Sequence, residues 1–331
     1  MLTLQAHAKI NWDLHVLGKR PDSFHALDTV MVNVSLCDTL TFERSAGLEF
    51  TCSDPALPTG EHNLVVKAAQ ALARAAGQPA AARIHLEKRI PAGGGMGGGS
   101  SDGASTLRGL NRLWGLNWPV PQLQPLAAEL GSDVAFFLFG GWRRCLGRGE
   151  IVEQLPGSEQ WPEVKLLLIM PPLHVSTPAV YKALQAPQWS VAQSSGLRRK
   201  PEACATSDRT SGVRKLEHVA AGVAAALGRL GSGASAQLGT RNDLVGPARL
   251  VEPQLAAVQR LLEECYPGRW QMSGSGAVHF AVAQPDVAQA VSLCSQADSL
   301  RHALTNACGP GIRVVAATTC GLDNGQLAMD N

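Results

Sequence analysis

The sequence has few of the features that mark a nucleic-acid-binding, membrane-spanning or disulfide-rich protein. Charged residues make up 17% of its 331 residues and the net charge is +2, so the basic excess of a nucleic-acid binder is missing. The longest apolar runs fall short of the roughly 20 residues that a membrane-spanning helix needs. The eight cysteines show no CxxC or metal-ligand spacing. We therefore expect no nucleic-acid or membrane partner, and reduced cysteines.

The N-terminus has no basic region followed by an apolar stretch, so we expect a cytoplasmic protein. An apolar content of 45% is typical of a globular chain, and the length favours two domains. The turn composition of Pro156–Pro162 predicts the junction, with an N-terminal domain over residues 1–160 and a C-terminal domain over 161–331. A polar segment near 188–212 predicts an exposed insertion in the second domain.

The first segment, from Ala8 to Val16, alternates apolar and polar residues, which predicts a half-buried strand. The two-residue period places Lys9, Asn11, Asp13 and His15 on one face. This spacing alone leaves open whether the polar face meets solvent or a ligand. A second strand is predicted from Leu27 to Leu36, so Phe24 and His25 fall on or just after the connecting turn.

A glycine-rich loop, Gly93–Gly99, follows a predicted strand (82–90) and precedes a predicted helix (100–116). Six glycines in seven residues expose backbone N–H groups, and a helix N-terminus stabilises an anion, so phosphate is the expected ligand. A GxGxxG match at Gly93, Gly95 and Gly98 fits a dinucleotide enzyme as well, and the GK[ST] of a Walker loop is absent. A flexible linker is the remaining alternative.

Three further positions stand out. Asn63 precedes an alanine-rich helical run (64–76) that Gly77 ends, so Asn63 is a predicted N-cap. Asp133 follows a glycine and a serine and is either a helix cap or a functional carboxylate. The segment Met272–Gly276 precedes a predicted strand and is either a bare turn or a second close approach of backbone to a ligand. Mixed strands and helices after residue 164 indicate an α+β chain.

Three motifs, at Ala8–Asn11, Pro91–Ser101 and Met272–Gly276, resemble in order those of the superfamily of galactokinase, homoserine kinase, mevalonate kinase and phosphomevalonate kinase, the GHMP kinases. The resemblance covers nearly the whole chain. It implies a two-domain α+β fold, with an N-terminal domain similar to ribosomal protein S5 domain 2 and a C-terminal ferredoxin-like α/β sandwich.

Within the superfamily the chain is most similar to the 4-diphosphocytidyl-2-C-methyl-D-erythritol kinases. Segments 8–25, 88–102 and 131–141 follow that family's pattern. The chain departs from it at Phe24, where tyrosine is common, at Ala135, where proline is common, and in the longer segment 188–212. Phenylalanine stacks as tyrosine does but lacks the O–H donor.

The resemblance implies that ATP phosphorylates the 2-hydroxyl of 4-diphosphocytidyl-2-C-methyl-D-erythritol, in the non-mevalonate route to isopentenyl diphosphate. Asp133 would be the catalytic base, Lys9 its charged partner, and Asn11 would help to position both. Phe24 and Tyr181 would stack on the cytosine, with His25 and Lys182 binding nearby.

The implied ATP site comprises Asn63, Pro91, Gly93, Gly94, Gly95, Gly97, Gly98, Gly99, Ser100 and Ser101. The third glycine motif adds Ser273, Gly274, Ser275 and Gly276. Mg²⁺ is expected with ATP, its ligand being unidentified and Ser101 only a candidate. Another alcohol kinase of the superfamily and a noncatalytic nucleotide sensor are the alternatives, and the oligomeric state stays open.

Overall fold

The structure is a computed structural model and describes residues 1–184, 214–231, 238, 240–283 and 293–320. The predicted insertion at 188–212 lies outside the described residues.

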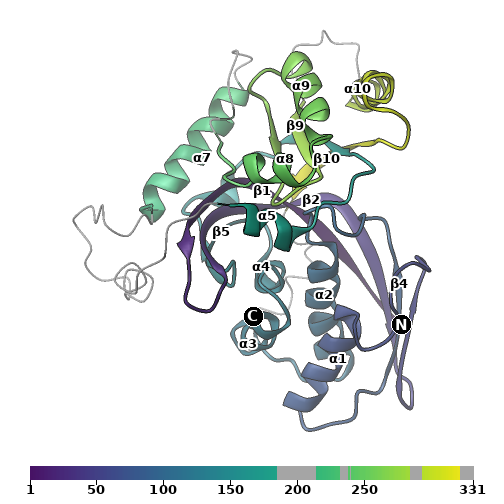
Figure 1. Ribbon diagram of the computed structural model, residues 1–331. Coiled ribbons are helices and arrows are strands. Elements are labelled where there is room, and N and C mark those ends of the chain that lie inside the picture. Colours follow the sequence, from purple (N-terminus) through teal and green to yellow (C-terminus); the bar gives the residue numbers. More distant parts are fainter. Residues whose placement is uncertain (185–213, 232–237, 239, 284–292, 321–331) are drawn as a thin grey trace.

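A long antiparallel hairpin of β1 (Leu2–Lys19) and β2 (His25–Glu43) runs through the centre of the molecule (Figure 1). Both strands exceed their predicted lengths. The predicted half-burial of β1 is wrong, because every residue from Ala8 to Leu14 is buried on one face or the other. The strand is covered on both sides, so its polar side chains face an internal cavity or ion pairs.

The described residues form a sheet of ten strands in the order β3-β4-β2-β10-β7-β9-β8, with β1 and β5 also paired to β2 and β6 paired to β5. Among the strand pairs that the structure describes, β3 and β4 pair in parallel and the others are antiparallel. The other strands are β3 (Leu48–Cys52), β4 (Ala82–Glu87), β5 (Trp142–Gly147), β6 (Ile151–Gln154), β7 (Lys165–Met170), β8 (Trp270–Met272), β9 (His279–Val282) and β10 (Arg313–Cys320). The mixed sheet confirms the predicted α+β class.

The two predicted domains share this sheet and part of one core. β10, near the end of the chain, pairs with β2 through Thr319 and Cys320. One hydrophobic cluster combines Ile10 and Trp12 with Leu166 and Phe280 from the second half. The division at residue 160 stays a prediction, but the halves are joined by backbone hydrogen bonds and by shared apolar packing.

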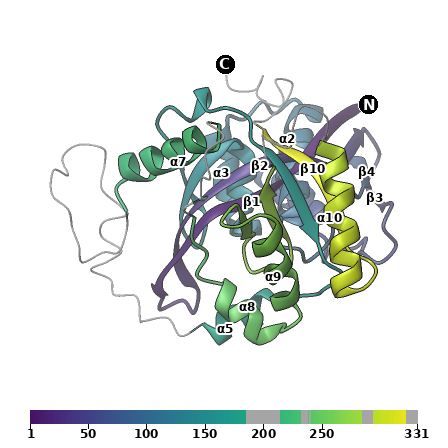
Figure 2. The ribbon, with the colours of Figure 1, turned by 90° about the horizontal axis from the view of Figure 1, so that it is seen from above.

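Helices cover both sides of the hairpin (Figures 1 and 2). On one side lie α1 (Leu64–Ala75), α2 (Gly98–Leu113), α3 (Val120–Leu130) and α4 (Val134–Phe139). On the other lie α7 (Leu216–Gly231), α8 (Val245–Val251), α9 (Leu255–Cys265) and α10 (Leu293–Cys308). The short α5 (Thr177–Ala183) lies beside the hairpin, and a 3₁₀ turn occupies Ser158–Gln160. None of the described helices is long and apolar enough to span a bilayer.

Local sequence explains where the helices beside the glycine loop begin. The Asn63 side chain accepts a hydrogen bond of 2.9 Å from the Val65 N–H, which confirms the predicted N-cap of α1. Helix α2 begins at Gly98, two residues before the predicted start, because Gly97 adopts φ +68° and ends the loop there. The first turn of α2 is therefore made of glycine and serine.

Gly109 tests how tightly α2 packs on the sheet. A Cβ at this position would lie 2.5 Å from the Phe42 ring, whereas one at Gly222, in the exposed face of α7, has no atom within 4 Å. We expect Gly109→Ala to lower the free energy of unfolding by about 1–3 kcal/mol through overpacking. Gly222→Ala should raise it by up to about 1 kcal/mol. Urea unfolding of both variants measures the change in the free energy of unfolding. A Gly109→Ala variant that is more stable than the unsubstituted protein would contradict this packing.

Candidate functional site

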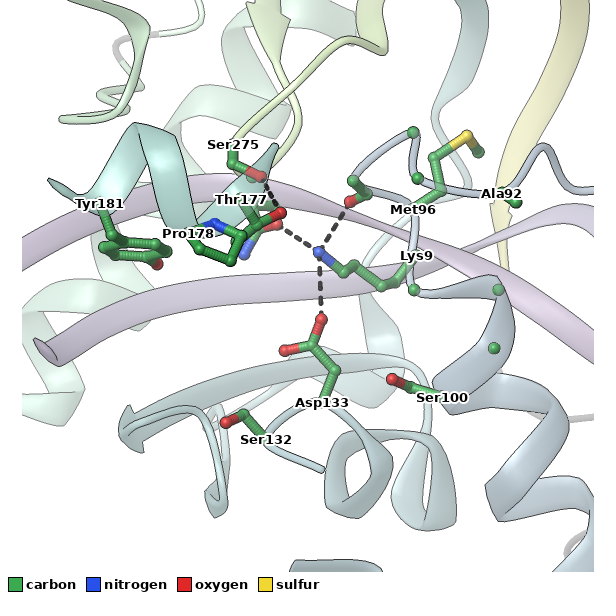
Figure 3. A pocket seen from close by; sticks show the side chains of 18 of the residues that line it. Lys9, Ala92, Met96, Ser100, Ser132, Asp133, Thr177, Pro178, Tyr181 and Ser275 are labelled. Carbon is green, nitrogen blue, oxygen red and sulfur yellow. Dashed lines mark hydrogen bonds and ion pairs between the residues drawn. The ribbon is translucent and has the colours of Figure 1, made fainter. Parts of the chain in front are cut away.

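A cavity of about 950 Å³ lies where the glycine loop, β1 and α5 meet (Figure 3). Most of the site residues predicted from the sequence line it: Lys9, Asn11, Phe24, His25, Asn63, Pro91, Gly93, Gly94, Gly95, Gly97, Gly98, Gly99, Ser100, Asp133, Tyr181, Lys182, Gly274 and Ser275. Ser101, Ser273 and Gly276 do not. Segments that are far apart in the sequence thus contribute to one cavity.

Lys9 is buried in the cavity wall, with 3% of its surface exposed. Its Nζ donates to Asn11 Oδ1 at 2.6 Å and to the Gly95 carbonyl at 2.9 Å. It also lies 3.5 Å from Asp133 Oδ2 (Figure 3). The polar face of β1 at Lys9 and Asn11 therefore meets the cavity, and the solvent-facing alternative is wrong for these two residues.

Asp133 stands at the N-cap position of α4, yet its side chain caps no backbone N–H. The carboxylate instead points toward the Lys9 ammonium, with 30% of the side chain exposed. The alternative that Asp133 is simply a helix cap is therefore wrong. A carboxylate that is partly accessible and held beside a buried ammonium can accept a hydrogen bond from a bound hydroxyl.

The glycine loop is held by close packing and is no flexible linker. A Cβ on Gly95 would lie 2.6 Å from the Ser273 carbonyl oxygen, and one on Gly97 would lie 2.9 Å from the Phe137 ring. Ser273 Oγ donates to the Gly95 carbonyl at 3.2 Å, and the Val278 N–H donates to Gly94 at 3.3 Å. The Met272–Gly276 segment therefore packs against the loop from behind, and is more than a bare turn.

Two neighbouring serines at the start of α2 have different surroundings. Ser100 lines the cavity. Ser101 is buried and its hydroxyl donates to the His7 carbonyl at 2.7 Å, away from the cavity. The structure therefore does not bring Ser101, the candidate ligand for Mg²⁺, to the other site residues. Among the described residues no group of three or more His, Cys, Asp or Glu side chains could hold a metal ion.

Aromatic and basic side chains gather at the other end of the cavity. The rings of His25 and Tyr181 stack at 5.1 Å between centroids and 27° between planes. Burial lowers the pKa of His25, and the nearby Lys19 lowers it further. Phe24 lies in the turn between β1 and β2 and Lys182 lies on α5. All line the cavity, so this end offers ring faces and positive charge.

A β-bulge between Asn11 and Asp13 ends the shared polar face of β1. Beyond it Leu14 lines the cavity, whereas Asp13 and His15 do not. The prediction that Asp13 and His15 continue the Lys9 face is therefore wrong, because the extra residue at a bulge breaks the period of two. Asp13 instead forms an ion pair with Arg214.

Arg214 links Asp13 to a second buried carboxylate, Asp28. Asp28 Oδ1 accepts from Arg144 Nε at 3.0 Å, and Oδ2 accepts from Arg214 Nε at 3.0 Å. Burial opposes ionisation of Asp28, but these hydrogen bonds and charges outweigh it and lower the pKa to about 2. This network fixes the strands behind the site.

Lys88 and Asp102 also line the cavity, although the sequence did not place them in the site. Lys88 Nζ lies 2.5 Å from Asp38 Oδ2 and 3.0 Å from Asp102 Oδ2. Burial and the Asp38 charge raise the pKa of Asp102, although Lys88 counteracts both. Lys88 lies just before the glycine loop in the sequence, and this position could have indicated a place in the site. Asp38 lies on β2, where no local pattern indicates such a role.

Comparisons with known proteins agree with this geometry. Residues 63–141 match the family described as GHMP kinases N terminal domain. A 4-diphosphocytidyl-2-C-methyl-D-erythritol kinase of Synechococcus sp. (strain CC9311) is 41% identical over 285 residues, which cover 84% of this chain and 85% of that relative. The chain belongs to the 4-diphosphocytidyl-2-C-methyl-D-erythritol kinase family.

Two further members of the 4-diphosphocytidyl-2-C-methyl-D-erythritol kinase family are similar to the chain. The kinase of Synechococcus sp. (strain CC9605) is 49% identical over 185 residues, which span 55% of this chain and 60% of that relative. The crystal structure of a 4-(cytidine 5'-diphospho)-2C-methyl-D-erythritol kinase matches with a TM-score of 0.69 and 33% identity, over 97% of this chain and 100% of that one. The predicted GHMP kinase fold is confirmed.

The Asp28 network predicts a pH-dependent stability. The folded-state pKa is about 2, below the ordinary value of 3.8, so ionised Asp28 stabilises the fold above pH 4 and this stabilisation is lost as the pH falls through 2. Asp28→Asn removes the carboxylate that pairs with both Arg144 and Arg214, although Glu153 still pairs with Arg144, and should cost about 3–5 kcal/mol at pH 7. The difference in the free energy of unfolding between Asp28→Asn and the unsubstituted protein should become smaller as the pH falls toward 2.

Urea unfolding at pH 7, 4 and 3 measures this difference. Asp298→Asn is the control, because Asp298 is exposed and pairs with Arg301 on the same helix. If Asp28→Asn lowers the free energy of unfolding by the same amount at all three pH values, the stabilising role of the Asp28 charge is contradicted.

Proposed function

We propose that this chain transfers the γ-phosphoryl group of ATP to the 2-hydroxyl of 4-diphosphocytidyl-2-C-methyl-D-erythritol, giving ADP and the 2-phosphate in the non-mevalonate route to isopentenyl diphosphate. Its site of action would be the cytoplasm, where ATP is supplied. One observation carries the proposal: the Lys9–Asp133 pair lies in a single cavity that has the glycine loop at one end and the aromatic cluster at the other.

The cavity is suited to two substrates that meet at the Lys9–Asp133 pair. The phosphates of ATP would contact backbone N–H groups of the loop and the N-terminus of α2, where the helix dipole favours an anion. The ATP base would lie toward Asn63, which lines the cavity beyond the loop. The acceptor would place its cytosine among Phe24, His25 and Tyr181, with Lys182 nearby.

The chemistry follows from this placement. As the acceptor oxygen bonds to the γ-phosphorus, the bond between that phosphorus and the ADP oxygen breaks. Asp133 would accept the proton that the hydroxyl loses. Lys9 would hold the carboxylate in place and stabilise negative charge at the reacting oxygens, and Asn11 would keep the Lys9 ammonium oriented through their 2.6 Å hydrogen bond. Alignment and charge stabilisation supply most of the catalysis in phosphoryl transfer.

Mg²⁺, when bound with ATP, would neutralise charge on the phosphates. A serine hydroxyl that faces the cavity fits such an ion, because Mg²⁺ keeps several waters and binds the substrate phosphates. Ser101 donates to His7 and Asp102 faces Lys88. Ser100, which lines the cavity, is therefore the residue that would hold the ion, in place of the Ser101 candidate.

Replacing Asp133 tests the proposed base. Asp133→Asn keeps the shape of the side chain and should lower kcat by about 10²- to 10⁴-fold, because the amide cannot accept the proton. A coupled assay for ADP release with the diphosphocytidyl substrate measures this. Asp298→Asn changes an exposed aspartate that does not line the cavity and should leave kcat unchanged.

Two outcomes would contradict the proposed function. One is a kcat of Asp133→Asn within twofold of the unsubstituted protein, in a variant with an unchanged circular dichroism spectrum. The other is that the unsubstituted protein phosphorylates a different alcohol, such as homoserine or mevalonate, but releases no ADP with the diphosphocytidyl substrate.

Tyr181 tests the assignment of the aromatic end. A ring stacked on a base is worth about 1–3 kcal/mol, so Tyr181→Leu should raise the KM of the acceptor by about 10-fold or more. Tyr181→Phe retains the ring and should change the KM of the acceptor little. The KM of ATP should be the same in both variants, and an equal rise in both KM values would argue against a base-binding role.

A further inference from the structure

The turn between β5 and β6 places Arg148 over the ring of Phe24. The guanidinium carbon lies 4.8 Å from the ring centroid, which is the geometry of a cation–π contact. Both residues line the cavity, and they come from segments more than 120 positions apart. The contact therefore joins the β5–β6 turn to the β1–β2 turn.

In the part of the chain that the structure describes, few other groups hold the Phe24 ring. The backbone of its turn is fixed, since the Phe24 N–H donates to Asp22 Oδ1 at 3.2 Å and the Arg20 N–H donates to the Phe24 carbonyl at 2.7 Å. The side chain is 49% exposed, and it belongs to none of the buried hydrophobic clusters formed by the described residues. Arg148 is the group that covers one of its faces.

The charge of Arg148 is already partly balanced. Its Nε lies 3.8 Å from Glu150 Oε1, and the other Glu150 oxygen accepts the Arg148 backbone N–H at 2.5 Å. Its Nη2 donates to the Ala128 carbonyl at 3.5 Å. A guanidinium with a neighbouring carboxylate is less suited to bind a phosphate, but it can still lie flat on a ring.

The same turn contacts the reacting end of the site. A Cβ on Gly149 would lie 3.5 Å from Asp133 Oδ1 and 3.4 Å from the Ser132 carbonyl oxygen. The residue next to Arg148 is therefore packed against the carboxylate that we propose as the base. One turn supports both the ring at the acceptor end and the start of α4.

We propose that Arg148 is a positioning residue for the acceptor: it holds Phe24 at the edge of the cavity so that the free face of the ring can stack on the pyrimidine. This inference rests on the proposed function, because it takes the aromatic end as the site of the acceptor base. A ring fixed before binding loses less conformational entropy when the base arrives. Arg148 thereby sets the affinity for the acceptor and has no part in the affinity for ATP.

A double-mutant cycle on Arg148 and Phe24 tests the proposal. Arg148→Met keeps most of the side-chain length without the charge, and should raise the KM of the acceptor about 3- to 5-fold, as expected for an exposed cation–π pair. Phe24→Leu removes the ring. In the Phe24→Leu background, Arg148→Met should change the KM by less than 1.5-fold, because the group it positions is absent. The KM of ATP should stay within twofold throughout.

Two control variants separate positioning from a general structural effect. Arg148→Lys retains a cation over the ring and should keep the KM of the acceptor within twofold of the unsubstituted protein. Arg143→Met removes a similar contact, since the Arg143 guanidinium carbon lies 5.9 Å from the Phe139 centroid, but Arg143 does not line the cavity. It should leave the KM of the acceptor unchanged.

An equal effect of Arg148→Met in both backgrounds would overturn the proposal, because Arg148 would then contact the acceptor itself. No effect in either background would overturn it as well. Binding of cytidine monophosphate, measured by calorimetry for the same variants without ATP, separates this test from the proposed function. If the unsubstituted protein shows no ADP release, the proposed function fails, while the same cycle measured by cytidine monophosphate binding still tests Arg148. If it binds no cytidine monophosphate, the inference on Arg148 fails.

Discussion

The buried ammonium of Lys9 is the interaction on which the site depends. A charged group in a protein interior is costly unless hydrogen bonds and an opposite charge compensate for it. Lys9 obtains both from three different segments: Asn11 on its own strand, the Gly95 carbonyl in the glycine loop and Asp133 at the start of α4. Satisfying one charge thus brings the strand, the loop and the helix to the same point. These are the parts that a phosphoryl transfer between two bound substrates requires.

The loop in turn depends on the second half of the chain. Gly95 packs on the carbonyl of Ser273, and Ser275 forms a hydrogen bond of 2.7 Å with Thr177 at the start of α5. The same α5 carries Tyr181. Because one segment supports the loop and contacts the helix of the acceptor end, the two ends of the cavity are mechanically connected. This agrees with the shared sheet and with the core cluster that contains residues of both halves.

Sequence patterns predicted those parts of the fold and site that depend on local rules. Asn63 as a cap and Lys9 with Asn11 on one face follow from spacing, and the structure has both. The two-residue alternation wrongly placed Asp13 on the same face as Lys9, because a β-bulge follows Asn11 and reverses the faces of the residues after it. A bulge has no clear signal in the sequence. The role of Asp133 came from the family resemblance, since its local sequence fits a helix cap equally well. The structure then decided against the cap.

Other parts could not be predicted, because they depend on long-range contacts. Strand β3, helix α8 and the three-residue β8 are short and are defined by their neighbours more than by their own periodicity. The Lys88–Asp38 pair joins positions 50 residues apart, and the Arg148–Phe24 contact joins two turns. Composition does not show which turns meet. These contacts become visible only when the sheet has placed its strands.

The fate of the phosphorus atom tests the central claim most directly. The purified chain is incubated with ATP that carries ¹⁸O in its γ-phosphoryl group and with 4-diphosphocytidyl-2-C-methyl-D-erythritol, and the labelled product is analysed by phosphorus NMR. The account predicts one new phosphate monoester on the 2-oxygen, formed in equal amount to ADP. Label found only in inorganic phosphate, or on a different hydroxyl, would contradict a site in which Lys9 and Asp133 direct the 2-hydroxyl at ATP.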